Sequence, residues 1–149
     1  MFAVGVSIPV ALLALAAKIA SAGNLESTLR NFARFGYALI PLDVAAHVAH
    51  NLFHLLAEGG SVFITVGALF GAQSNASPAL VGNGTIQILQ YLLLALGLAG
   101  SLYTARQIAH RRYRTPARRR STLIPFSVLI IVLGALNAVM FLSPMAHRM

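Results

Sequence analysis

The stretch from Asp43 to Glu58 reads DVAAHVAHNLFHLLAE. Polar side chains interrupt a run that is otherwise typical of a membrane helix. At about 100° per residue, these side chains fall within an arc of about 100° on a helix about 22 Å long. We call this set the histidine stripe, and its members are Asp43, His47, His50, Asn51, His54 and Glu58.

The composition places the whole chain in a membrane. Of its 149 residues, 58% are hydrophobic and 9% are charged, whereas a soluble domain has about 25% charged residues. We therefore expect one multi-span membrane domain over residues 1–149, in contact with the lipid bilayer. The chain has no cysteine, which excludes disulfides, thiolate metal sites and iron–sulfur clusters within it.

Four apolar runs are long enough to cross a bilayer. They predict an all-α integral membrane helical bundle with four transmembrane helices. The expected spans are Phe2–Ala20, Tyr37–Ala57, Ile86–Ala109 and Thr122–Leu142. The first run has an alternative interpretation as a signal peptide, because Ala20, Ser21 and Ala22 resemble a cleavage site. We favour a retained helix because no positive charge precedes the run and Lys18 lies near its end.

A short interfacial helix is expected between the first two spans, with Asn24 as its cap. Apolar residues repeat there at helical spacing, and charged residues fill the other side; an ordinary connecting helix is the alternative. The apolar set is Leu25, Leu29, Phe32 and Phe35, and the charged set is Glu26, Arg30 and Arg34. After the second span, Gly59 and Gly60 predict a break, which leaves residues 61–70 as a projecting extension or a short re-entrant or interfacial helix.

Basic residues set the expected orientation. Six of the eleven lie between Arg111 and Arg120, in a segment expected to be a loop that contains Pro116. A dense basic loop between apolar runs is typical of the cytoplasmic side, so we expect a cell (cytoplasmic or inner) membrane protein with both termini outside. The same distribution argues against nucleic-acid binding, because no aromatic platform or binding motif accompanies it.

The histidine stripe is the candidate site, since ionisable groups within a membrane are costly and usually functional. His47, His50 and His54 have the spacing of ligands to copper, zinc or iron, with Asp43 as a further ligand or a supporting acceptor. Haem b is a separate alternative, in which a partner subunit would supply the second axial histidine. Asn51 and Glu58 are secondary members. A structural polar seam and a proton relay ending at Glu58 are the alternatives. We expect the three histidines to face the bundle interior, against the third or fourth span.

Small residues on those two spans predict close helix packing there. Gly97 and Gly100 lie on one, and Gly134 and Ala138 on the other, where Asn137 is a lone polar group. No serine- or cysteine-nucleophile arrangement and no phosphate-cradling loop is visible, so no catalytic residue is expected.

The segment YALIPLDVAAHVAHNLFHLLAEG, residues 37–59, resembles a segment of membrane-bound polyferredoxin-type (4Fe-4S) proteins. Those proteins carry a helix similar to HxxHxxFH, which His47, His50, Phe53 and His54 match. The ending LSPMAHRM, residues 142–149, also resembles theirs, and the two stretches cover about a fifth of the chain. The family's cysteine motifs are absent here.

The resemblance implies a membrane module of a redox system. We therefore expect a non-catalytic subunit or accessory module of an electron-transfer or metal-handling system, with clusters on another membrane or redox subunit. The alternative is a transporter-like pathway for protons or metal ions. A redox module needs a cluster- or haem-bearing partner, whereas a transporter does not.

Overall fold

The computed structural model describes residues 2–71 and 79–142, without the side chains of residues 2–6. The sequence predicts a loop over residues 71–85, and seven of its fifteen residues, 72–78, lie outside the described residues. The same is true of residues 143–149, which carry nearly all of the second stretch of the resemblance.

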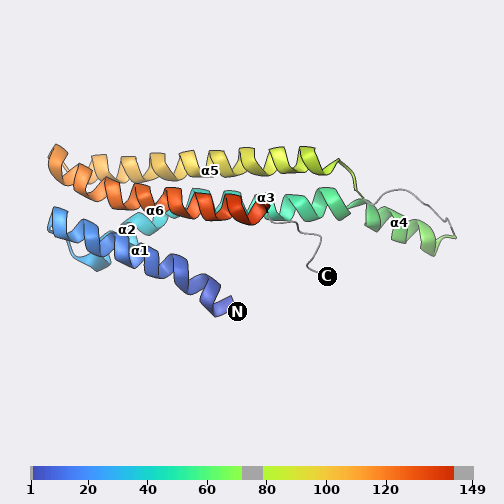
Figure 1. The fold of residues 1–149 in the computed structure, drawn as a ribbon, viewed down its shortest axis with the longest axis horizontal. Coiled ribbons are helices and arrows are strands. Elements are labelled where there is room, and N and C mark those ends of the chain that lie inside the picture. Colours follow the sequence, from blue (N-terminus) through green and yellow to red (C-terminus); the bar gives the residue numbers. More distant parts are fainter. Residues whose placement is uncertain (1, 72–78, 143–149) are drawn as a thin grey trace.

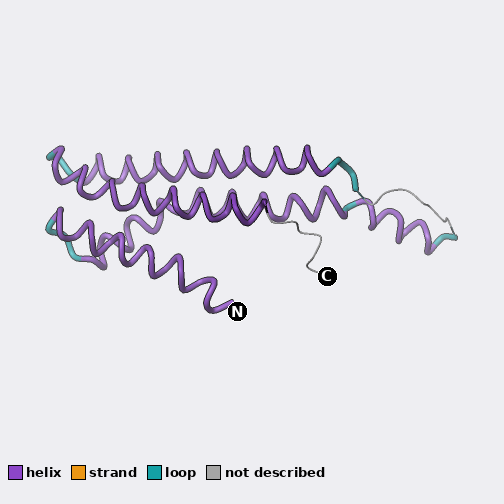
Figure 2. The backbone as a smooth tube through the Cα atoms, viewed as in Figure 1, coloured by secondary structure: helices purple, strands orange, loops and turns teal. Residues whose placement is uncertain are grey.

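The described chain is helical almost throughout (Figures 1 and 2). A single turn of 3₁₀-helix, η1 (Tyr37–Leu39), joins two of the helices. The α-helices are α1 (Phe2–Asn24), α2 (Thr28–Gly36), α3 (Ile40–Glu58), α4 (Gly60–Leu69), α5 (Asn83–Arg112) and α6 (Pro116–Leu142). The predicted all-α class is confirmed.

Four helical segments are long and apolar enough to cross a membrane, as predicted. They are Ser7–Asn24, Thr28–Glu58, Asn83–Arg112 and Pro116–Leu142. Since Thr28–Glu58 includes α2, the expected interfacial helix runs through η1 directly into the second span. The chain is thus a multi-pass membrane protein with a short additional apolar helix, α4.

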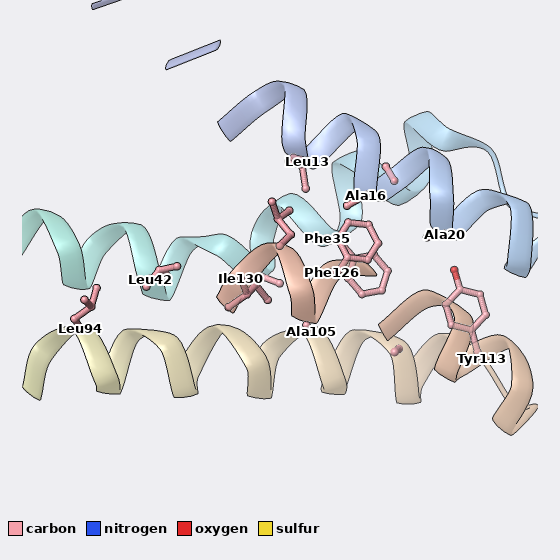
Figure 3. Close-up of a cluster of buried hydrophobic side chains, with 14 residues drawn as sticks. Leu13, Ala16, Ala20, Phe35, Leu42, Leu94, Ala105, Tyr113, Phe126 and Ile130 are labelled. Carbon is pink, nitrogen blue, oxygen red and sulfur yellow. The ribbon is translucent and has the colours of Figure 1, made fainter. Parts of the chain in front are cut away.

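The helices form an elongated bundle in which the ends of α1, α2, α5 and α6 meet at one end (Figure 1). α3 packs along α5, while α6 packs on both α5 and α1. Phe35 of α2 and Phe126 of α6 stack with their ring centroids 4.1 Å apart. They lie in the main core (Figure 3), together with small residues of α1 such as Ala16 and Ala20. This core joins the first helix to the last.

The predicted small-residue faces lie at helix contacts. A Cβ built on Gly97 would meet the Pro41 carbonyl oxygen at 2.9 Å and would overlap the Cβ of Ala45. Gly134 is similarly close to Leu98 of α5. Polar groups of α5 also serve the α3 backbone, because Ser101 Oγ accepts from Leu42 N at 2.9 Å and Gln90 Nε2 donates to Ala49 O at 3.0 Å. The α3–α5 contact therefore combines close approach with satisfied backbone groups.

Several expected boundaries are wrong. The basic segment 111–120 is mostly helical, because α5 continues to Arg112 and α6 begins at Pro116, leaving only Tyr113–Thr115 as the connection. Proline suits the first turn of a helix, where its missing N–H costs nothing. Similarly, α2 is capped by Ser27, whose Oγ accepts from Arg30 N, whereas Asn24 is the last residue of α1.

The buried face of α2 also differs from the expected apolar set. Leu25 and Leu29 are exposed, while Asn31 is fully buried beside Phe35. Asn31 is buried because polar side chains at this end of the bundle form hydrogen bonds with it, as described below.

The predicted break after the second span is confirmed at Gly59. α3 ends at Glu58 and α4 starts at Gly60, with Gly59 itself in a helical conformation. α4 extends beyond the end of α5 (Figure 1), and Phe63 and Leu69 on it are largely exposed. It is thus a short apolar helix that projects beyond the end of α5.

Candidate functional site

The histidine stripe lies on α3 but faces away from the bundle. All six members are exposed, whereas Leu42 and Ala49 on another face of the same helix are buried against α5. The expectation that His47, His50 and His54 face the interior of this chain is therefore wrong. The third span is the neighbour of α3, as expected, but α5 is contacted by the small apolar face and not by the stripe.

Physical reasons for this placement are visible at the α3–α5 contact. Close packing there needs small side chains, which α3 offers at Ala45, opposite Gly97, and at the fully buried Ala49. Bulky imidazoles at the same contact would force the helices apart. The face of α3 opposite the stripe, which the sequence predicts to be apolar, is also largely unburied, since Val44, Val48 and Leu55 on it are exposed.

Within the stripe, interactions are local and few. His54 Nδ1 lies 3.3 Å from Glu58 Oε2, and Asn51 Nδ2 donates to the backbone oxygen of His47 at 2.8 Å. The His50 and His54 rings meet edge to face, with centroids 5.1 Å apart. These contacts hold side chains in place along one face of α3, but they do not enclose a binding site.

The stripe does not form a metal centre by itself. Among the described residues, no group of three or more histidine, aspartate or glutamate side chains is arranged to hold a metal ion. Most transition-metal sites need three or four protein ligands. A metal ion bound at His47, His50 or His54 would therefore take further ligands from outside the described part of this chain.

Asp43, at one end of the stripe, also lines a pocket of about 280 Å³. The pocket is bounded by residues of α1, α2, η1, α3 and α6, and Asn137 is the other polar side chain in its lining. The Nδ2 of Asn137 donates to the Leu133 oxygen of its own helix at 2.9 Å. The stripe thus begins beside a mostly apolar pocket between the helices.

A second polar group, which the sequence did not indicate, lies where α1, α2, α5 and α6 meet. We call it the polar cluster: Asn24, Glu26, Asn31, Tyr113 and Thr122. Asn24 is its centre, because its Nδ2 donates to Tyr113 Oη and to Thr122 Oγ1, both at 2.9 Å. Its Oδ1 accepts from Glu26 N at 2.9 Å, and Asn31 faces it at 3.3 Å. The Tyr113 side chain reaches toward α1 from the far side of the bundle (Figure 3).

Glu26 joins this cluster to the basic residues around it. Its carboxylate accepts from Arg34 at 2.7 Å and from Arg112 at 2.6 Å, while Tyr113 Oη donates to it at 3.1 Å. The Glu26 side chain is only 12% exposed, so these charges interact with less screening than a surface pair.

The titration of the cluster follows from these contacts. Partial burial alone raises the pKa of Glu26, but hydrogen bonds from Arg112 and Tyr113 and the charges of Arg34 and Arg112 outweigh it. The pKa of Glu26 therefore lies below its ordinary value. Burial raises the pKa of Tyr113, and its hydrogen bond to the Glu26 carboxylate raises it further. The ionised carboxylate and the neutral phenol are thus the stable pair.

One sequence signal was available for this cluster. Between Lys18 and Arg34, Glu26 is the single acidic residue, and the other charged residues there are basic. A lone acidic residue among arginines is a candidate for a shared ion pair. The participation of Tyr113 and Thr122 had no such signal, because each is a common residue at a helix end.

Comparison with protein-family models, with curated proteins and with solved structures finds no match to this chain.

Proposed function

We propose that this chain is a non-catalytic membrane subunit of an electron-transfer or metal-handling complex, and that its histidine stripe faces another polypeptide of that complex. One observation carries the proposal: His47, His50 and His54 are exposed on the outer face of a membrane-spanning helix. Imidazoles and carboxylates facing lipid are costly. A second chain covering the stripe removes that cost.

At such an interface, the three histidines supply part of a ligand set for copper, zinc, iron or haem b. Asp43 supports them, and the partner completes the coordination. The resemblance of residues 37–59 to polyferredoxin-type membrane proteins supports a redox partner carrying the clusters that this cysteine-free chain lacks.

The proposed orientation in the cell membrane places the basic end of the bundle in the cytoplasm. The end of α1 and the helix α2, whose sequences carry Lys18, Arg30 and Arg34, lie at the same end of the bundle as the α5–α6 connection (Figure 1), which supports the positive-inside assignment. An Ala117→Cys variant should then react with impermeant thiol reagents only from the cytoplasmic side. Gly82→Cys, at the opposite end, should react from outside, and the reverse pattern would exclude this orientation.

The ligand role is tested on the complex as purified from membranes. We expect stoichiometric metal or a haem Soret band, and we expect a His47→Gln, His50→Gln and His54→Gln triple variant to lose it, because an amide replaces imidazole poorly at these metals. His147→Gln, a change of the same chemistry outside the stripe, should retain it. A cofactor-free preparation in which the triple variant keeps its stability would instead support a structural seam.

A pathway for protons or metal ions is the second candidate, favoured by the His54–Glu58 contact and the adjacent His50 ring. A row of imidazole and carboxylate groups can pass protons from one group to the next. The chain isolated without a redox partner and moving ions in liposomes would support this candidate and refute the redox proposal.

A further inference from the structure

A small pocket on the outer face of α5 has no part in the stripe or the polar cluster. It has a volume of about 260 Å³ and is lined by Tyr103, Arg106, Gln107 and His110. These positions are i, i+3, i+4 and i+7 of one helix face, so their side chains form one continuous surface near the end of the helix. Apolar α5 residues give way to basic ones at this level.

Most of the polar groups in the pocket are hydrogen-bond donors. Gln107 Nε2 donates to Tyr103 Oη at 2.7 Å, which leaves the phenolic hydrogen to point elsewhere. Arg119 of α6 lies 3.1 Å from His110 Nδ1. A guanidinium group can only donate, so His110 Nδ1 accepts and its Nε2 carries the hydrogen. The pocket therefore presents three kinds of hydrogen-bond donor, which are the Arg106 guanidinium, the Tyr103 hydroxyl and the His110 Nε2–H.

No negative charge of the described chain balances this pocket. The three ion pairs found among residues 2–71 and 79–142 join Glu26 to Arg34, Glu26 to Arg112, and Glu58 to His54. Arg106 and Arg119 therefore have no carboxylate partner within that part of the chain. The pocket suits an anion that can accept several hydrogen bonds at once.

An apolar track continues from the pocket along the same face of α5. Ala99, Leu96 and Leu92 precede Tyr103 by four, seven and eleven residues, which are the spacings of one helix face. All three are exposed. A tyrosine between an apolar surface and a basic one is typical of the headgroup level of a membrane.

We propose that this pocket binds the phosphate of an anionic phospholipid, with an acyl chain lying along Ala99, Leu96 and Leu92. Arg106 supplies the charge, and Tyr103 and His110 supply neutral donors. Arg119 orients His110 and adds positive potential. The apolar track distinguishes a lipid from free phosphate, because inorganic phosphate has no apolar part that could contact that surface. The proposal does not depend on the role of the histidine stripe.

The test measures lipid bound to the purified protein, titrated with phosphatidylglycerol or phosphatidylcholine and observed by native mass spectrometry. Arg106→Gln should weaken phosphatidylglycerol binding about fivefold, the effect of one basic residue near a headgroup. Arg106→Lys should recover part of the loss, and Tyr103→Phe should cause a smaller one. The matched control is Arg114→Gln, which removes the same charge from the exposed α5–α6 connection.

Phosphatidylglycerol should bind more tightly than phosphatidylcholine, and millimolar inorganic phosphate should not displace it. Equal losses in Arg106→Gln and Arg114→Gln would refute the site and indicate diffuse charge attraction. Equal affinity for the two lipids would refute anion recognition, and displacement by phosphate would show a free-anion site. Because Arg106 is exposed, its replacement removes no core packing.

Discussion

Replacement of Asn24 by alanine tests whether the polar cluster holds the basic end of the bundle together. The change removes donation to Tyr113 and Thr122 and the acceptance of the Glu26 N–H, three bonds of 2.9 Å at a side chain only 2% exposed. Each is worth about 1 kcal/mol net. The two hydroxyls keep other partners, so we expect a loss of about 2 to 3 kcal/mol in the free energy of unfolding.

The assay is equilibrium unfolding in mixed micelles, with the denaturing detergent increased stepwise and helix content followed by circular dichroism. Asn137→Ala is the matched control, since the Nδ2 of Asn137 bonds, among the described residues, only to the Leu133 oxygen of its own helix. That variant should remain within about 0.5 kcal/mol of the parent, because alanine is the better helix former. Equal losses in the two variants would refute a special role of Asn24, as would strict additivity with Thr122→Val.

Three further changes follow from the structure. Gly97→Val should destabilise the bundle by about 1 to 3 kcal/mol through overpacking against α3, whereas Gly84→Ala, with open space around its Cβ position, should not, as detergent unfolding of both will show. Because the pKa of Glu26 is lowered in the folded protein, its ionised carboxylate stabilises the fold above pH 4.5, the usual pKa, and this stabilisation is lost as the pH falls through the folded-state pKa. The Glu26→Gln variant should therefore lose less stability than the parent on acidification. Parallel profiles of stability against pH for the two proteins would contradict this. Leu25 has φ of 62°, a left-handed conformation that suits glycine at a helix end, so Leu25→Gly should raise the free energy of unfolding, measured in the same assay, by about 1 kcal/mol.

The positions of the membrane spans follow from sequence because hydropathy and length alone determine them. The break at Gly59 and the close contact at Gly97 were also predictable, since glycine acts there through its lack of a side chain. The rotation of α3 was not predictable in this way. In a bilayer, residues facing lipid and residues facing neighbouring helices are both apolar, so a polar stripe identifies a special face without telling which neighbour it meets.

The polar cluster was missed for a different reason. Asn24 at the start of a polar break is typical of a helix cap, and nothing local distinguishes a cap from a buried hydrogen-bonding centre. Its partners Tyr113 and Thr122 come from the far end of the chain, and single-sequence patterns carry no signal for contacts at that separation. Arginines near Tyr113 also favoured a loop, although arginine is a good helix former and extends both α5 and α6.

The same separation has a consequence for the order in which the protein is made. Tyr113 follows Asn24 by 89 residues and Thr122 follows it by 98. At ordinary rates of translation, these partners are made roughly 5 to 20 s after Asn24. During that time α1 has α2 beside it but lacks α6, its main packing neighbour. Nascent chains that stop before Thr122 should therefore leave the first helix pair undocked, with its asparagines hydrated at the membrane surface. The packing of α1 is thus completed by α6, which leaves the ribosome after the other described helices.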